Sequence, residues 1–269
     1  MLGGRLSVHL LPSAPYSARD PVRSRALGVS LQRQQGVHAI GSDRRTDFDA
    51  WPGVLTFTPA GLPVFSESPV GGEYVVARWS GLLPGEPAAG LPGHRTSIEG
   101  HRQAWAIGRA IRKLLLQPQV DALAVEEAAV QFIGLCAPWA PVRQRVDRAR
   151  LARILDRIAD EYDQPLTLSR LAGAEGLTEV AFLREFSRVM GTTPHAFIVE
   201  TRLQAARALI AGTEMPLAQV APACGFAHQS HLGAAFARSL GMTPHRYRGL
   251  CHADSRARTQ RRALPVKAR

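Results

Sequence analysis

The chain has 269 residues, 45% of them hydrophobic, and a formal net charge of +11 from 33 Lys+Arg and 22 Asp+Glu. No apolar run approaches the roughly 18 to 20 residues that a membrane-spanning helix needs. Its three cysteines, at positions 136, 224 and 251, are odd in number and widely spaced, which excludes a disulfide framework and a zinc pattern. We therefore expect a cytoplasmic protein without a membrane segment.

The N-terminal half predicts a β-rich part followed by two helices. Residues 1–30 show little pattern, whereas residues of about 31–80 form short apolar bursts between Gly, Pro and Asp, the texture of β-strands. A Pro- and Gly-rich loop follows. Within about 96–136, AWAIGRAIRKLLL and DALAVEEAAVQFIGL have helical apolar spacing. They predict an antiparallel hairpin that packs on the β part or on another subunit, within a domain over 1–138.

The C-terminal half predicts helices throughout and holds most of the charge. Residues 142–269 contain 20 Lys+Arg and 11 Asp+Glu, a balance of +9, against +2 from 13 and 11 in residues 1–141. We expect a linker over 139–148, a helical domain over 149–250, and a basic, disordered tail over 251–269. A basic domain attracts phosphate backbones, but charge alone favours nucleic-acid binding only weakly, because it also provides solubility.

One segment of the helical domain occurs twice. FSRVMGTTPHAF begins at Phe186 and FARSLGMTPHRY begins at Phe236, with six identical positions at an offset of 50. Each copy predicts a short helix, a glycine turn, a second helix and a glycine stop; in the first copy Thr178 is the expected N-cap and Gly191 ends the helix. This order is typical of a helix-turn-helix unit, whose second helix lies in the DNA major groove. Helix packing alone could also repeat a turn, but two copies are too few for a solenoid.

The second copy carries a family resemblance. PLAQVAPACGFAHQSHLGAAFARSLGMTPHRYR, Pro216 to Arg248, is similar to the signature of the AraC/XylS family of bacterial transcription regulators, and residues 149–250 resemble its DNA-binding domain. The resemblance implies seven helices with two helix-turn-helix units, preceded by an effector-binding or dimerisation domain, often a cupin-like barrel with helices. The fold prediction is therefore α+β: a β-rich cupin-like domain with a helical hairpin, then an all-α DNA-binding domain.

In the first recognition helix, Phe182, Phe186 and Met190 are expected to be buried. Similarity to the family implies that Val180, Leu183 and Arg184 face bases. Arginine can bind guanine bidentately, whereas valine and leucine offer only apolar contacts such as those to thymine methyls. The alternative for Arg184 is a solvated charge or an ion pair.

The second recognition helix has fewer side chains suited to reading bases. Gln229, Ser230 and His231 occupy the base-contacting end, while His231 could equally cap or pack. Ala227 is expected at the capping position and Ala234 where arginine is common, so this helix is predicted to start weakly and to bind mainly through the backbone. Elsewhere, Arg188 and Arg238 are predicted to contact phosphates or to be solvated charges.

No motif in the N-terminal half predicts an enzyme. His38 has no second histidine at cupin metal spacing, so we expect no catalytic residue, no metal and no cofactor. A small-molecule effector pocket is predicted near four aromatic residues that could instead simply fill the core: Trp51, Phe57, Phe65 and Trp79.

The functional prediction is a sequence-specific transcription regulator with two recognition helices in successive major grooves. Candidate partners are double-stranded promoter DNA, RNA polymerase, a small-molecule effector and a second copy of the chain, in a homodimer formed through the N-terminal half. The alternative is a cupin-type binding or catalytic protein whose basic half only anchors it to DNA.

Overall fold

The structure is a computed structural model that describes residues 5–81, 83, 91–136 and 147–252. The chain falls into two compact units, one built mainly on residues 1–146 and the other mainly on residues 147–269. The predicted linker lies largely outside the described residues, as does the predicted tail beyond His252. Among the residues described, no helix is both long and apolar enough to span a membrane.

The first unit contains two antiparallel sheets. The five-stranded sheet has the order β1-β8-β3-β6-β9 and the four-stranded sheet the order β2-β7-β4-β5. The strands are β1 (Leu6–Leu11), β2 (Tyr16–Arg19), β3 (Arg25–Ser30), β4 (Gln34–Ile40), β5 (Arg45–Ala50), β6 (Leu55–Thr58), β7 (Val64–Ser68), β8 (Tyr74–Trp79) and β9 (Thr96–Ile98). The predicted start of the β part, at about residue 31, was wrong, because three strands precede it. Prolines and charged residues between these strands hid their alternation.

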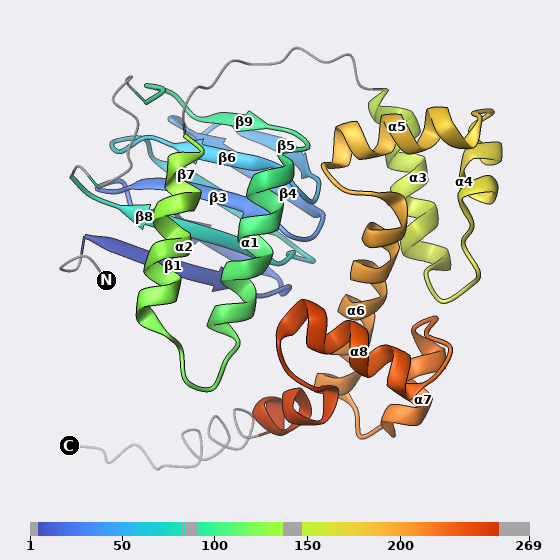
Figure 1. Cartoon of the computed structure of the whole chain (residues 1–269). Helices are drawn as coiled ribbons and strands as arrows, with labels where there is room; N and C mark the ends of the chain where they lie inside the picture. The colour runs from blue at the N-terminus through green and yellow to red at the C-terminus, as the bar shows by residue number, and fades with distance from the viewer. Residues whose placement is uncertain (1–4, 82, 84–90, 137–146, 253–269) are drawn as a thin grey trace, which may run out of the picture. The chain divides into compact units, whose positions relative to one another are not determined.

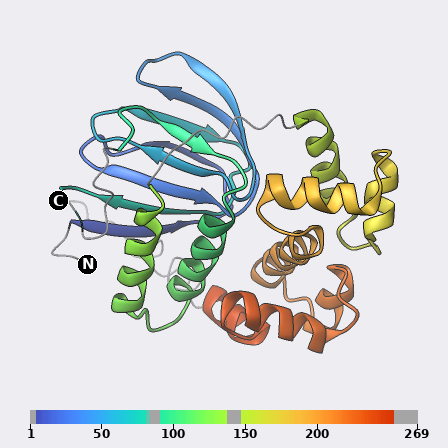
Figure 2. The same cartoon turned by 45° about the horizontal axis from the view of Figure 1, so that its top comes forward.

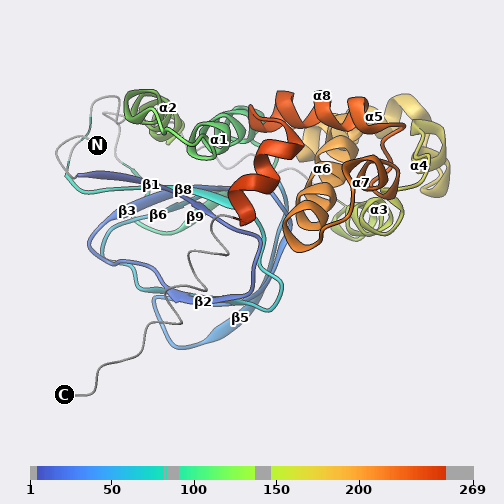
Figure 3. The same ribbon diagram turned by 90° about the horizontal axis from the view of Figure 1, so that it is seen from below.

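Two helices, α1 (Arg102–Leu115) and α2 (Ala122–Gly134), pack on the five-stranded sheet. They lie on the face turned away from the four-stranded sheet (Figures 2 and 3). Side chains of these helices and of that sheet, among them Leu27, Phe57, Ile111 and Phe132, form the fully buried hydrophobic core of the unit. Of the two predicted packing partners of the hairpin, the structure shows the β part.

The second unit consists of helices. They are α3 (Arg148–Glu161), α4 (Leu168–Ala174), α5 (Glu179–Met190), α6 (Pro194–Gly212), α7 (Leu217–Ala223) and α8 (Gln229–Leu240). Residues 244–252 are also helical, so the helix continues two residues into the predicted tail. The 19-residue α6 joins the helix pair α4/α5 to the helix pair α7/α8 (Figure 1) and is about 28 Å long at 1.5 Å per residue.

The sequence repeat corresponds to a repeat of backbone conformation. The turn inside each pair has a glycine with positive φ, 67° at Gly176 and 73° at Gly225. The second helix of each pair also ends on such a glycine, with φ of 68° at Gly191 and 72° at Gly241. A side chain on Cβ disfavours this conformation, so the glycines fix where each helix stops and turns.

Candidate nucleic-acid interface

Helix α5 has one buried face and one exposed face. Its first turn is capped by Thr178, whose Oγ1 accepts a hydrogen bond of 3.3 Å from the Ala181 amide, as predicted. Phe182, Phe186 and Met190 are each 1% exposed, which confirms the predicted buried stripe. Side-chain packing thus fixes the rotation of α5 about its axis, and with it the residues that the opposite face presents.

The exposed face of α5 carries all three residues predicted to read bases in the first pair. Val180 is 59% exposed and Leu183 is 38% exposed. Arg184, the next residue after Leu183, is also exposed. Within the described residues, Arg184 makes no hydrogen bond or ion pair, so the ion-pair alternative is not realised there. Two exposed large apolar side chains beside an extended guanidinium suit a surface that another molecule covers.

Helix α8 begins differently from the prediction. The N-cap is His228, whose Nδ1 accepts a hydrogen bond of 3.2 Å from the His231 amide. The expectation that Ala227 holds the capping position was therefore wrong by one residue, because the repeat offset of 50 pairs Thr178 with His228. Histidine is an uncommon N-cap, so composition alone gave little signal of this role.

The predicted base-contacting residues of α8 all lie at its exposed N-terminal end. Gln229, Ser230 and His231 are exposed, while Leu232 and Phe236 are fully buried. The His231 ring meets Phe226 edge-on at 5.3 Å between centroids. The His231 side chain therefore packs on Phe226 and is also exposed. Its position is compatible with both predicted roles, base contact and packing.

Basic side chains flank the exposed residues of both α5 and α8. Arg188 is exposed in the last turn of α5, and Arg238 is exposed in the last turn of α8. His195 and His245 are exposed at the starts of the helices that follow. Across the described residues, no group of three or more His, Cys, Asp and Glu could hold a metal ion.

Polar contacts hold the helical unit together around α6. Arg202 donates from Nε to the Tyr162 carbonyl at 2.6 Å and from Nη2 to the Gln164 carbonyl at 2.9 Å. Two residues earlier in α6, the buried Glu200 carboxylate accepts a hydrogen bond of 3.2 Å from the Ser239 hydroxyl of α8. These contacts connect α6 to the end of α3 and to α8.

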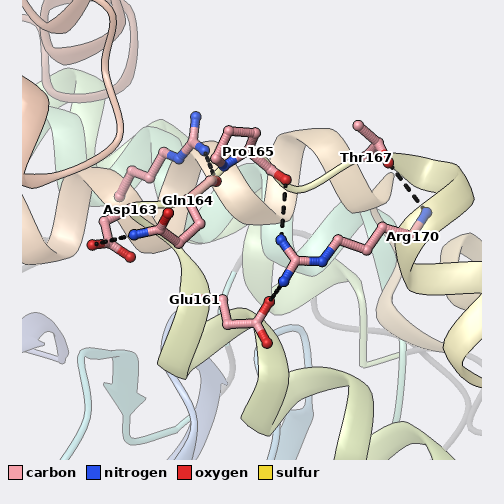
Figure 4. Close-up of polar contacts among 7 residues, drawn as sticks. Glu161, Asp163, Gln164, Pro165, Thr167 and Arg170 are labelled. Carbon is pink, nitrogen blue, oxygen red and sulfur yellow. Dashed lines mark hydrogen bonds and ion pairs between the residues drawn. The ribbon is translucent and has the colours of Figure 1, made fainter.

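The connection between α3 and α4 is ordered by side chains of its own (Figure 4). Arg170 lies between the Glu161 carboxylate at 2.8 Å and the Pro165 carbonyl at 3.4 Å, and Thr167 caps α4 through the Arg170 amide at 3.1 Å. Glu161 is the last residue of α3, so the Glu161–Arg170 pair joins consecutive helices.

The four aromatic residues predicted near an effector pocket lie on different surfaces of the first unit. Phe57 and Trp79 belong to the core between sheet and helices, with ring centroids 6.2 Å apart, and Trp51 is 3% exposed. Phe65 is half-buried on the four-stranded sheet, beneath the guanidinium of Arg45 at 5.0 Å. The structure thus brings Phe57 and Trp79 together and places Phe65 on the other sheet.

Comparison with known proteins identifies transcription regulators as relatives of this chain. A family model described as a helix-turn-helix domain matches residues 171–249. The probable transcriptional regulator LumQ of Photobacterium leiognathi is 36% identical over 104 residues, 39% of this chain and 42% of LumQ. The transcriptional activator NphR of a Rhodococcus species is 26% identical over 239 residues, 82% of this chain and 69% of NphR. The chain spans less than half the length of LumQ.

Among solved structures, the chain is similar to the DNA-binding domain of AdpA, a global transcriptional factor, in complex with a target DNA. The identity is 25% and the TM-score 0.38, over 39% of this chain and 95% of that one.

Proposed function

Because the chain belongs to the AraC/XylS family of helix-turn-helix transcriptional regulators, we propose that it binds promoter DNA through two helix-turn-helix units, α4/α5 and α7/α8. Helices α5 and α8 are the recognition helices of this proposal, and they enter successive major grooves on one face of the duplex. The connecting helix α6, at about 28 Å, is of the same order as the roughly 34 Å between such grooves.

The observation that carries the proposal is the exposed face of α5. Arg184 has no partner within the described residues and is free to bind guanine through two donors, while Val180 and Leu183 offer apolar surface to thymine methyls. In α8, Gln229 has the donor and acceptor that suit adenine, and Ser230 and His231 lie beside it. Arg188 and Arg238 are proposed to contact phosphates, which position a protein without choosing a sequence.

The first unit is proposed to be a cupin-like sandwich that dimerises the protein and binds a small-molecule effector. Its two facing antiparallel sheets support this proposal, as does its position ahead of a DNA-binding unit in one chain. A homodimer would place four reading helices on one promoter, where RNA polymerase also binds. The same role puts the protein in the cytoplasm with the DNA.

Footprinting on the promoter beside the gene, over a range of salt concentrations, tests the proposal. We expect protection of a site of about two helical turns or more, with an affinity that falls steeply as salt rises. The alternative, a cupin-type binding or catalytic protein anchored by a basic half, predicts equal binding to every sequence at physiological salt. That result would overturn the proposal.

A further inference from the structure

The face that the five-stranded sheet turns toward the four-stranded sheet carries several polar side chains beside the apolar Val76. In β3, Leu27 and Val29 point toward α1 and α2, so the alternate residues Ala26, Gly28 and Ser30 face the four-stranded sheet. The register of the five-stranded sheet places polar residues on the same side: Thr58 and Arg78 opposite Ala26, and Tyr74 opposite Ser30. The facing surfaces of a β-sandwich are normally apolar, because their contact forms the core.

Arg95 extends this polar surface. Its Nη1 donates a hydrogen bond of 2.8 Å to the Thr58 hydroxyl, which faces the four-stranded sheet. Across the gap, burial lowers the pKa of His38 and the charge of Arg95 lowers it further. Burial raises the pKa of Tyr16, and Arg95 opposes that rise. The guanidinium therefore acts on side chains of both sheets.

The space between the sheets contains polar side chains that are only partly buried. Five of its polar side chains keep intermediate exposure, whereas the core on the other face of the five-stranded sheet includes many residues at 0%. The five are Tyr16, His38, Tyr74, Arg78 and Arg95. The core between the five-stranded sheet and the helices supplies the apolar burial of this unit. The space between the sheets therefore does not have to be filled with apolar side chains for the unit to be stable.

Arg95 is the cation of this space that lacks an acidic partner. Arg78 is paired with Asp20 at 3.1 Å, whereas Arg95 has a hydroxyl as its hydrogen-bond partner and no carboxylate among the residues described. A guanidinium held by one neutral hydroxyl retains donors for a further acceptor.

Tyr74 is positioned by a glycine. A Cβ added at Gly28 would collide with the Tyr74 hydroxyl, so the absence of a side chain there lets the phenol lie across β3. Burial raises the pKa of Tyr74 to about 12, which keeps the hydroxyl protonated and able to donate at neutral pH. His38 and Phe48 stack at 5.3 Å with an interplanar angle of 9°, giving an aromatic wall on the four-stranded sheet.

We propose that the space between the sheets binds a small organic carboxylate, with the Arg95 guanidinium bound to the carboxylate and the Tyr74 hydroxyl as a further hydrogen-bond donor. Guanidinium matches a carboxylate with two parallel hydrogen bonds, and the interaction is stronger where water is partly excluded. The inference rests on the proposed effector-binding role of this unit and specifies the chemical class of effector.

Isothermal titration of the full chain with matched acids and amides tests the inference. The probes are sodium phenylacetate against phenylacetamide and sodium succinate against succinamide. At least one carboxylate is expected to bind with a dissociation constant of about 1 mM or tighter, and at least about 10-fold more tightly than its amide. Equal binding of acid and amide, or no binding by either carboxylate, would overturn the inference.

Substitution of Arg95 locates the site. Arg95→Gln is expected to weaken carboxylate binding by about 10- to 100-fold, whereas Arg23→Gln, an exposed arginine of the same unit, leaves it unchanged. If Arg95→Gln melts early, Arg95→Lys carries the test, because it keeps the charge and loses the planar fork; a loss of several-fold is expected. An unchanged affinity in the folded Arg95 variant would refute the site.

Footprinting of the same variants without carboxylate separates this inference from the proposed function. Site-specific protection by Arg95→Gln, together with lost carboxylate binding, is the expected pair of results. Site-specific protection by a wild type that binds no carboxylate would overturn this inference alone. Sequence-independent DNA binding would overturn the proposed function, while the titration would still report on the site.

Discussion

Replacing Arg202 with methionine is expected to destabilise the helical unit by about 3 kcal/mol. Arg202 donates 2.6 Å and 2.9 Å hydrogen bonds to the Tyr162 and Gln164 carbonyls. Tyr162 is the C-cap of α3, so its carbonyl has no partner within that helix. Hydrogen bonds to charged groups contribute about 1.5 to 3 kcal/mol each, and the bond to Gln164 is exposed and belongs at the low end or below. Methionine keeps much of the stem and removes both bonds.

Urea unfolding followed by circular dichroism measures this loss. Arg157→Met on α3 is the matched control, because Arg157 is half-buried and no side-chain hydrogen bond of it occurs within the described part of the chain. The control is expected to change the free energy of unfolding by less than about 0.5 kcal/mol. Equal losses in the two variants, or a loss below about 1 kcal/mol for Arg202→Met, would refute the assigned role of Arg202.

The same substitution is expected to change how strongly DNA affinity depends on the distance between the two proposed DNA contacts. A Cβ at Gly225, in the turn of the second pair, would lie 2.7 Å from both Arg202 Nε and the Tyr162 carbonyl. Arg202 thus holds that turn against the end of α3. One base pair inserted between the two contacts moves them about 3.4 Å apart along the duplex. Wild type should lose affinity on the insertion, and Arg202→Met should lose less; an identical loss contradicts this.

Three further changes test other parts of the molecule. Arg184→Ala should cost about 1 to 3 kcal/mol of DNA binding and relax one position of the site, whereas a uniform loss over all sequences would show a phosphate contact instead. His228→Ala should lower the free energy of unfolding in urea by about 0.5 to 2 kcal/mol, comparable with Thr178→Ala. An unchanged free energy would show that the His228 cap does not stabilise α8. Burial lowers the pKa of His38, with Arg95 adding to the effect, and burial also lowers the pKa of His101, both from 6.5. Below about pH 6.5 the unfolded chain therefore binds more protons than the folded chain. The free energy of unfolding should be unaffected by these two histidines above about pH 6.5 and should fall as the pH drops through their lowered folded pKa values. The free energy of unfolding, measured at two pH values, should change less with pH once both histidines are replaced by glutamine. An unchanged pH dependence would contradict this assignment.

Helix boundaries in the second unit were predictable because their signals are local. The buried stripe of Phe182, Phe186 and Met190 has helical spacing, and Gly191 and Pro194 mark the end of one helix and the start of the next. Each signal lies within a few residues of the boundary that it sets. The cap of α8 escaped prediction because histidine is uncommon there, although strict use of the repeat offset pairs His228 with Thr178.

The contacts that position these helices were not predictable. Arg202 binds a carbonyl 40 residues away, and a backbone carbonyl has no sequence identity to recognise. In the first unit, alternation along each strand could be read, but the face that meets α1 and α2 could not. Phe57 and Trp79 were therefore candidates both for a pocket and for a core, and packing against the helices places them in the core.

The difference between α5 and α8 indicates how the proposed readers divide their task. At the offset of 50, Val180, Leu183 and Arg184 correspond to Ser230, Gly233 and Ala234. The α5 side chains at these equivalent positions are therefore larger than those of α8. Short side chains reach fewer base edges but allow a helix backbone to come closer to DNA. A helix N-terminus also attracts phosphate through its unpaired amides. Exchange of the three α5 residues for their α8 counterparts should therefore reduce discrimination between promoter sites more than it reduces total affinity. The reverse exchange, which gives α8 the α5 residues, should add sequence preference at the second groove, and footprints of the two exchanged proteins on randomised sites would measure both effects.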